Sequence, residues 1–218
     1  MNSPAMVSSR PPTSARLHRQ RAVTIMELLL VIAIISTLAG VAMPAVSGLM
    51  RGQNMTRNVF SIRGALEEAR VTAMSQNTFV WLGLCEKTVD GVPSLVITAL
   101  SSRSGQSTDL QAGNTRVVIK PTTLRNITID ADGVAGLPGV DRQNSTALNQ
   151  SQYAFEVKLP GQSGASTFKA VEFKPNGEVG LCTGALRYVL IGLSSGPNQE
   201  VAGIQLARLN GHAEVFRQ

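Results

Sequence analysis

The organisation of the chain follows from residues 21–51, which read RAVTIMELLLVIAIISTLAGVAMPAVSGLMR. Between Glu27 and Arg51 no residue is charged, which leaves 23 uncharged positions from residue 28 to residue 50. At ~1.5 Å per helical residue these positions span about 34 Å, enough to cross the hydrocarbon core of a bilayer. The stretch therefore predicts a membrane helix with one acidic residue at its start.

The residues around that acid follow a recognisable order: basic residues, a small residue, four uncharged residues, the acid and a long apolar run. This order resembles the amino terminus of type IV prepilins and type II secretion pseudopilins. In that family a prepilin peptidase cuts before the apolar segment and methylates the new terminal amine. The resemblance places the cut between Ala22 and Val23, where the family usually has Gly and Phe. Glu27 would then be the fifth residue of the mature chain and Pro44 the twenty-second.

Glu27 has two interpretations. An unpaired carboxylate in lipid costs several kcal/mol, and so does an unpaired amine at the membrane edge. A carboxylate that faces the terminal amine of a neighbouring subunit removes both costs, which predicts that Glu27 docks one subunit on another. The alternative is an interfacial acid that extends into the lipid headgroups. Pro44 removes one helical hydrogen bond, so we expect a kink there.

The charge distribution predicts the topology. The chain has 20 basic and 14 acidic residues, a net charge of +6, but four of the arginines lie in residues 1–22, which contain no acid. The mature chain would carry 16 basic and 14 acidic residues, or +2. A positive segment before an apolar helix stays in the cytoplasm. We therefore expect a single-pass protein of the bacterial inner membrane with a periplasmic carboxy-terminal domain.

Four segments follow from composition and periodicity. Residues 1–22 are rich in Ser, Pro and Arg and are expected to be a cleaved cytoplasmic leader. Residues 23–50 form the membrane or filament-core helix, and residues 51–77 continue it as an amphipathic helix. Residues 78–218 are expected to form a periplasmic β domain. The amphipathic stripe consists of Met55, Val59, Ile62, Leu66, Ala69 and Ala73.

The rest of the chain contains short apolar or alternating segments separated by Gly, Pro, Asn and Ser, which predicts antiparallel strands. The predicted fold class is α+β and pilin-like, with the long N-terminal helix packed on an antiparallel β-sheet domain. Residues 101–115 and 130–152 lack a periodic apolar pattern and are predicted to be surface loops. The predicted strands are residues 79–84, 95–100, 116–120, 127–129, 153–159, 170–173, 187–193, 201–209 and 213–216.

The two cysteines, Cys85 and Cys182, are far apart and form no CxxC motif. In an oxidising compartment they could form a disulfide that closes a loop of about a hundred residues, worth up to ~4 kcal/mol. Two separate buried thiols are an equally good interpretation.

Three further stretches narrow the resemblance. Residues 66–84, LEEARVTAMSQNTFVWLGL, residues 173–177, FKPNG, and the Asn-Gly pair at 210–211 are similar to the H-type minor pseudopilins of the general secretion pathway and to their type IV pilus relatives. The turn residues also have a purely structural explanation, because Pro and Gly set the dihedral angles of tight turns.

No motif for catalysis, phosphate binding or metal binding occurs, and His212 is the only histidine outside the leader. We therefore expect no enzyme activity and no cofactor. Some related minor pilins bind DNA near the carboxy terminus, but only Arg208 and Arg217 are basic there, so DNA is a weak candidate partner.

The expected function is that of a minor pseudopilin of a type II secretion system. Its expected partners are other pseudopilins or pilins, the prepilin peptidase and the inner-membrane assembly platform, and the processed protein would assemble into a periplasmic filament. Two alternatives stay open: a minor pilin of a type IV pilus, acting in pilus assembly or DNA uptake, and a membrane-tethered periplasmic binding protein.

Overall fold

The structure is a computed structural model that describes residues 24–161, 164–180, 186–195 and 200–217, with the side chains of residues 41–53 outside the description. The chain divides into two compact units, Met1–Val46 and Ser47–Gln218. One helix, α1 (Ile25–Ser75), belongs to both units.

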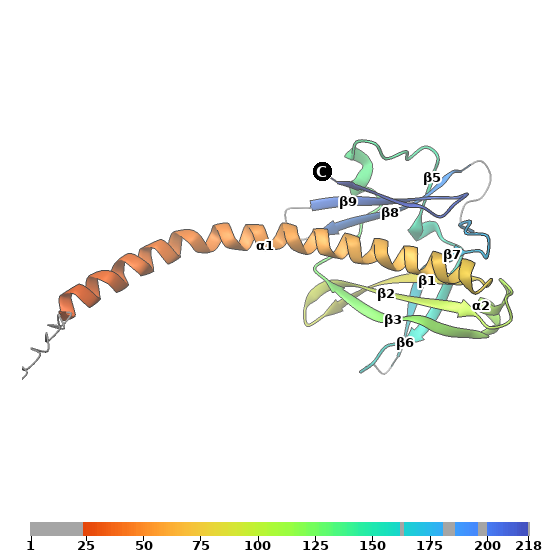
Figure 1. The fold of residues 1–218 in the computed structure, drawn as a ribbon, viewed down its shortest axis with the longest axis horizontal. Coiled ribbons are helices and arrows are strands. Elements are labelled where there is room, and N and C mark those ends of the chain that lie inside the picture. The colour runs from red at the N-terminus through yellow and green to blue at the C-terminus, as the bar shows by residue number, and fades with distance from the viewer. Residues whose placement is uncertain (1–23, 162–163, 181–185, 196–199, 218) are drawn as a thin grey trace, which may run out of the picture. The chain divides into compact units, whose positions relative to one another are not determined.

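In the described part of the chain, ten strands follow α1, with a short helix and two 3-10 turns among them (Figure 1). The elements are β1 (Val80–Val89), β2 (Val92–Ser102), α2 (Asp109–Ala112), β3 (Thr115–Arg125), β4 (Thr128–Ile129), η1 (Gly133–Gly136), β5 (Ser145–Ala147), η2 (Leu148–Gln150), β6 (Ala154–Lys158), β7 (Ala165–Phe173), β8 (Tyr188–Ser195), β9 (Glu200–Ala207) and β10 (Ala213–Arg217).

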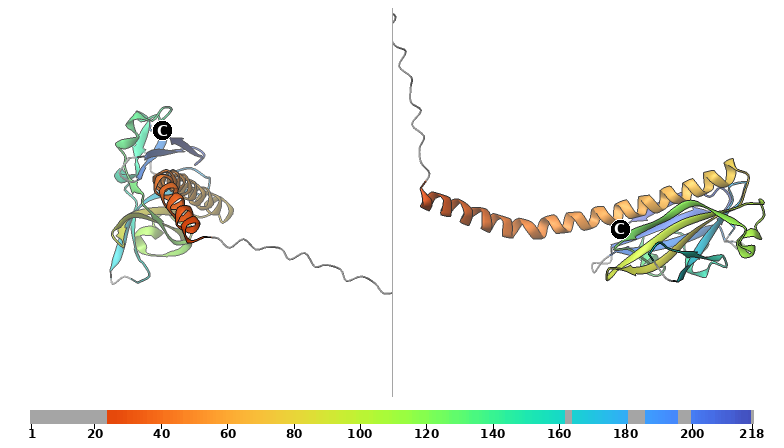
Figure 2. Two further views of the ribbon diagram at one scale, coloured as in Figure 1. Left: turned by 90° about the vertical axis from the view of Figure 1, so that its left-hand side faces the viewer. Right: turned by 90° about the horizontal axis from the view of Figure 1, so that it is seen from below.

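The strands form two separate sheets. Sheet A has the order β3-β2-β1-β7-β6, and every neighbouring pair in it is antiparallel. Sheet B has the order β10-β9-β8-β4, and β5 pairs with β8 in parallel along the same edge that β4 occupies. In the end-on view of Figure 2, the second half of α1 lies between the two sheets.

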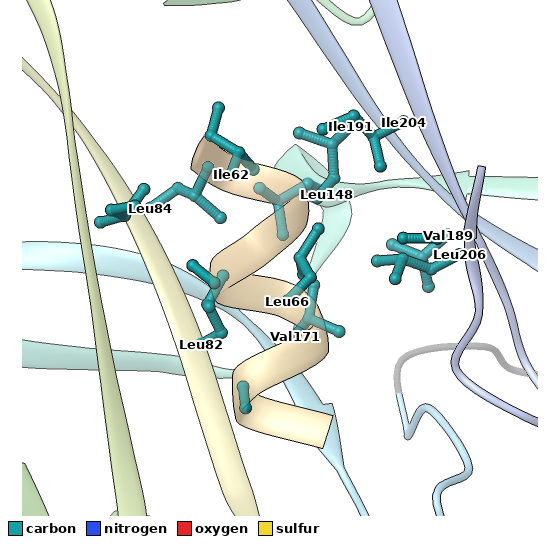
Figure 3. Packing of buried hydrophobic residues seen from close by; sticks show 14 of the residues in the cluster. Ile62, Leu66, Leu82, Leu84, Leu148, Val171, Val189, Ile191, Ile204 and Leu206 are labelled. Atoms are coloured by element: carbon teal, nitrogen blue, oxygen red, sulfur yellow. The ribbon is translucent and has the colours of Figure 1, made fainter. Parts of the chain in front are cut away.

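The core of the second unit forms around this half of α1. The helix residues Ile62 and Leu66 are fully buried, with Leu82 and Leu84 of sheet A on one side and Ile191 of sheet B on the other (Figure 3). Spacings of three and four residues put the buried side chains on one stripe of the helix, which both sheets cover. The buried positions of the stripe are Met55, Val59, Ile62, Leu66, Ala69 and Ala73.

The helix ends at Ser75, and Asn77 reverses the chain two residues later. Asn77 has a positive φ of 48°, and the Thr78 N–H donates to the carbonyl of Ala73 at 3.0 Å. This hydrogen bond closes a loop of six residues that contains the left-handed Asn77. It gives a partner to a backbone carbonyl that has none within the last helical turn. The chain thereby reverses direction and enters β1 beside the helix.

The predicted fold class is wrong. Of the residues that the structure describes with their side chains, 43% lie in strands and 29% in helices, so this part of the chain is mostly β. The strands form two sheets where one was expected, and the β5–β8 pair is parallel. Helical residues up to Val46 belong to a unit apart from the sheets. Hairpin signals identify neighbouring strands but do not say to which sheet a hairpin belongs, which explains the error.

The two predicted surface loops are also corrected. Residues 130–152 contain η1, β5 and η2, and they bury Val134, Leu137 and Leu148. Residues 101–115 contain α2, whose first residue, Asp109, is buried. These segments fill the core with single apolar residues at irregular spacing, so periodicity could not find them.

Candidate functional site at the start of the helix

The first unit presents an apolar helix surface on all sides. Every described residue from Thr24 to Gly40 is exposed in this unit, and Glu27 is the only charged one. Apolar surface of this extent normally marks an interface with a partner or a lipid phase. The large apolar side chains are between 46% and 80% exposed: Ile25, Met26, Leu28, Leu29, Leu30, Val31, Ile32, Ile34, Ile35 and Leu38.

The hydroxyl groups on this helix are satisfied within it. Ser36 Oγ donates to the carbonyl of Ile32 at 2.7 Å, and Thr37 Oγ1 donates to the carbonyl of Ile34 at 2.8 Å. A hydroxyl that bonds back to the preceding turn needs no partner from outside. Both side chains can therefore enter an apolar environment without leaving a donor unpaired.

Glu27 occupies the first turn of α1, where it has a local structural role. Its backbone N–H donates to Thr24 Oγ1 at 3.2 Å, so Thr24 caps the helix. Thr and Glu three residues apart form the capping-box pattern, and an acid in the first turn is favoured by the helix dipole. This capping pattern is visible in the sequence, and the sequence reasoning missed it.

The other residues predicted at this site lie wholly or partly outside the description. Ala22 and Val23 are outside the described residues. Pro44 lies within α1, in the part whose side chains are not described, so the kink stays a prediction.

Among the residues whose side chains are described, no helix contains an apolar window long enough to cross a membrane. The predicted span of residues 28–50 includes residues 41–50, whose side chains fall outside that description.

Cys85 lies on β1, and its half-buried thiol has no disulfide partner among the described residues and donates to the carbonyl of Glu86 at 3.5 Å. Burial raises the pKa of this thiol. Cys182 is outside the described residues, so the structure does not test the proposed pairing.

The second unit contains a buried carboxylate that sequence reasoning missed. Glu172 of β7 lies opposite Trp81 of β1 and is only 2% exposed. Trp81 Nε1 donates to Glu172 Oε2 at 3.0 Å, and the Tyr153 hydroxyl donates to Oε1 at 3.2 Å. Desolvation outweighs these hydrogen bonds and raises the pKa of Glu172, and burial beside the carboxylate also raises the pKa of Tyr153.

A second acid, Asp109, is buried at the start of α2. Ser102 Oγ donates to its Oδ2, as do the backbone N–H and the hydroxyl of Ser104, and the Asn114 amide donates to Oδ1. These hydrogen bonds, led by the one from Ser102, hold the pKa of Asp109 well below its usual range. The carboxylate ties residues 102–114 into one compact loop, which is a structural role.

No group of three His, Cys, Asp or Glu side chains that could hold a metal ion occurs in the described part of the chain. The absence of catalysis stays a prediction. The chain was compared with protein-family models, with curated proteins and with solved structures, and none of them matches it.

Proposed function

We propose that this protein is a minor subunit of a bacterial secretion filament, a pseudopilin of a type II secretion system. The observation that carries the proposal is the helix from Thr24 to Gly40, which is apolar on every side and has one acid in its first turn. The proposal rests on this helix and on the residues that precede it, and it does not depend on a likeness of fold.

The order of residues gives the proposed mechanism of assembly. Cleavage between Ala22 and Val23 creates a new amine one residue before the Thr24 cap and one helical turn before Glu27. In an apolar environment this amine needs a counter-charge, and the Glu27 carboxylate of a neighbouring subunit supplies one. The apolar helices then pack side by side, which removes their surface from water.

In this proposal the unprocessed chain sits in the inner membrane by residues 28–50, with the domain after Met50 in the periplasm. The prepilin peptidase and the assembly platform act on it there, and processed subunits enter the filament. The arginines of residues 1–22 keep that end in the cytoplasm.

Replacing Glu27 tests the docking role. Glu27→Val should leave the protein processed and folded but absent from filaments, because the neighbour's amine loses its counter-charge. The measurement is the amount of the variant in sheared filament fractions relative to the membrane fraction. Mass spectrometry of the same samples should show a chain that begins at a methylated Val23.

Two matched variants separate docking from helix capping and from general charge. Thr24→Ala removes the Oγ1 acceptor of the Glu27 N–H and should leave filament entry largely intact. Glu68→Val removes an exposed acid further along the same helix and should have no effect. Normal incorporation of Glu27→Val, or an equal loss with Thr24→Ala, would contradict docking. A chain that still begins at Met1 would contradict processing.

A further inference from the structure

β10 has one open edge, and that edge faces α1. β10 pairs only with β9 among the described strands and ends sheet B. The Ala207 N–H donates to the carbonyl of His212 at 3.0 Å, so His212 and Ala207 are a hydrogen-bonded pair. Because such positions alternate along an antiparallel ladder, the backbone groups of Ala213, Val215 and Arg217 point away from β9. These three residues form the open edge of the sheet.

Contacts to α1 occur at both ends of this edge, through the backbone of Ala213 and the side chain of Arg217. The Ala213 N–H donates to Glu67 Oε1 of α1 at 3.4 Å, which confirms that the edge points toward the helix. A hollow of about 550 Å³ is lined by Ala213, Val215 and Arg217 of the edge and by Phe60 and Arg63 of α1. An open strand edge is a template on which another extended chain can pair. We call this hollow, between α1 and the edge at Val215 and Arg217, the β10 groove.

The side chains of the β10 groove combine an apolar surface with positive charge. Phe60 is 53% exposed, and the Arg217 guanidinium carbon lies 5.0 Å from the centre of its ring. Arg217 Nη1 donates to Thr56 Oγ1 at 2.8 Å, but its Nη2 is buried and has no acceptor within the described residues. Neither Arg217 nor Arg63 forms an ion pair with a described carboxylate.

We propose that the β10 groove binds an extended acidic segment of a partner protein by strand addition. The backbone of the segment pairs with Val215 and Arg217, an apolar side chain of the segment covers Phe60, and a carboxylate meets Arg63 and Arg217. Backbone hydrogen bonds supply affinity in this mode, and side-chain pockets supply specificity. The inference does not rest on the proposed filament role.

The charges favour a peptide over a nucleic acid. Glu214 also lines the groove, and the carboxylate of Glu67 lies 3.7 Å from His212 Nδ1 at its end. These acids interrupt the positive surface, whereas a phosphate backbone needs a continuous row of basic side chains. A single carboxylate that alternates with apolar residues along a strand fits two arginines beside an exposed phenylalanine.

The test uses the full chain in detergent micelles and a fluorescein-labelled peptide of alternating valine and glutamate, eight residues long. Fluorescence anisotropy should show saturable binding that weakens as salt is added. Arg63→Ala and Arg217→Ala should each weaken binding about tenfold, the usual scale for a lost charge-assisted hydrogen bond. The matched control is Arg125→Ala, which removes an arginine from β3, an edge strand of sheet A, and should not change binding.

Two altered peptides make the test independent of protein folding. Lysine in place of glutamate should abolish binding through charge. Methylation of the central four peptide nitrogens keeps the charges but removes the backbone donors, and it should also abolish binding.

Four results would each overturn the proposal. The methylated peptide could bind as well as the parent peptide, or Arg125→Ala could weaken binding as much as Arg63→Ala does. Duplex DNA that displaces the peptide and binds with a higher affinity would make the groove a polyanion site. A self-associated chain that becomes monomeric on Arg63→Ala, seen by sedimentation, would make a second copy the occupant.

Discussion

At the scale of single residues, Glu172 shows how neighbouring strands create an environment that the local sequence conceals. It alternates with Val171 and Phe173, which point into the main core, so the pattern predicts an outward-facing and hydrated side chain. In the structure this outer face of sheet A carries an apolar cluster of its own, which includes Trp81 and Phe168. Of residues 170–173 only Ala170 belongs to this cluster, and most of the other members lie on β1, β2 and β6, so the local sequence does not reveal it.

The raised pKa of Glu172 makes stability depend on pH. The folded protein keeps this proton at pH values at which the unfolded chain has lost it, so the free energy of unfolding falls as the pH rises from below 4.5, the ordinary value, through the folded pKa. Glu172→Gln cannot ionise. Relative to the unaltered protein, its free energy of unfolding should therefore increase between pH 4 and pH 8 in urea titrations.

The neighbouring Glu178 provides a control of opposite sign. Its hydrogen bond from Lys174 lowers its pKa, so it stabilises the fold above its ordinary pKa and loses this contribution as the pH falls. Glu178→Gln should become less stable relative to the unaltered protein between pH 4 and pH 8. Parallel pH profiles for the two variants would show that Glu172 is not buried as described.

At the scale of elements, the sequence predicts where strands lie better than how they associate. Each of the nine predicted strands overlaps an observed one, because turn residues and apolar runs are local signals. β5 was missed, since three residues beside a 3-10 turn have no period to detect. The two sheets and the parallel pairing of β5 with β8 depend on contacts between distant segments, which no local pattern encodes.

For functional sites too, local sequence patterns were predictable and contacts between distant segments were not. Glu27 and its apolar surroundings are contiguous in the sequence, so spacing alone singled them out. The β10 groove combines residues from α1 with residues from the last strand, and its charge is visible only after folding.

The helix stripe should carry much of the stability of the second unit. Leu66 is fully buried between the two sheets, so Leu66→Ala removes contacts on both sides and should lower the free energy of unfolding by about 2–5 kcal/mol. Val71 lies on the same helix and is 56% exposed. Val71→Ala should change the free energy of unfolding by less than about 0.5 kcal/mol. Urea midpoints measure both, and similar losses would contradict a helix that is buried on one stripe.

At the scale of the whole molecule, the hydrophobic core of the second unit contains no described residue of the first unit. The described core begins at Met55. A chain that begins at Ser47 should therefore be soluble and unfold in one cooperative transition, with the same urea midpoint as the full chain. Gradual unfolding, or a much lower midpoint, would show that the first unit contributes to the fold.

The position of α1 between two sheets sets the order of events during folding. The helix is synthesised before every strand that covers it, and its contact with Arg217 joins residues 161 positions apart. Contacts between residues so far apart in the sequence form slowly, because a long loop of chain must close first. Until β8, β9 and β10 arrive, one side of the stripe stays uncovered and open to premature association. A chaperone that holds the nascent chain would have its greatest effect in this interval, before sheet B closes over the helix.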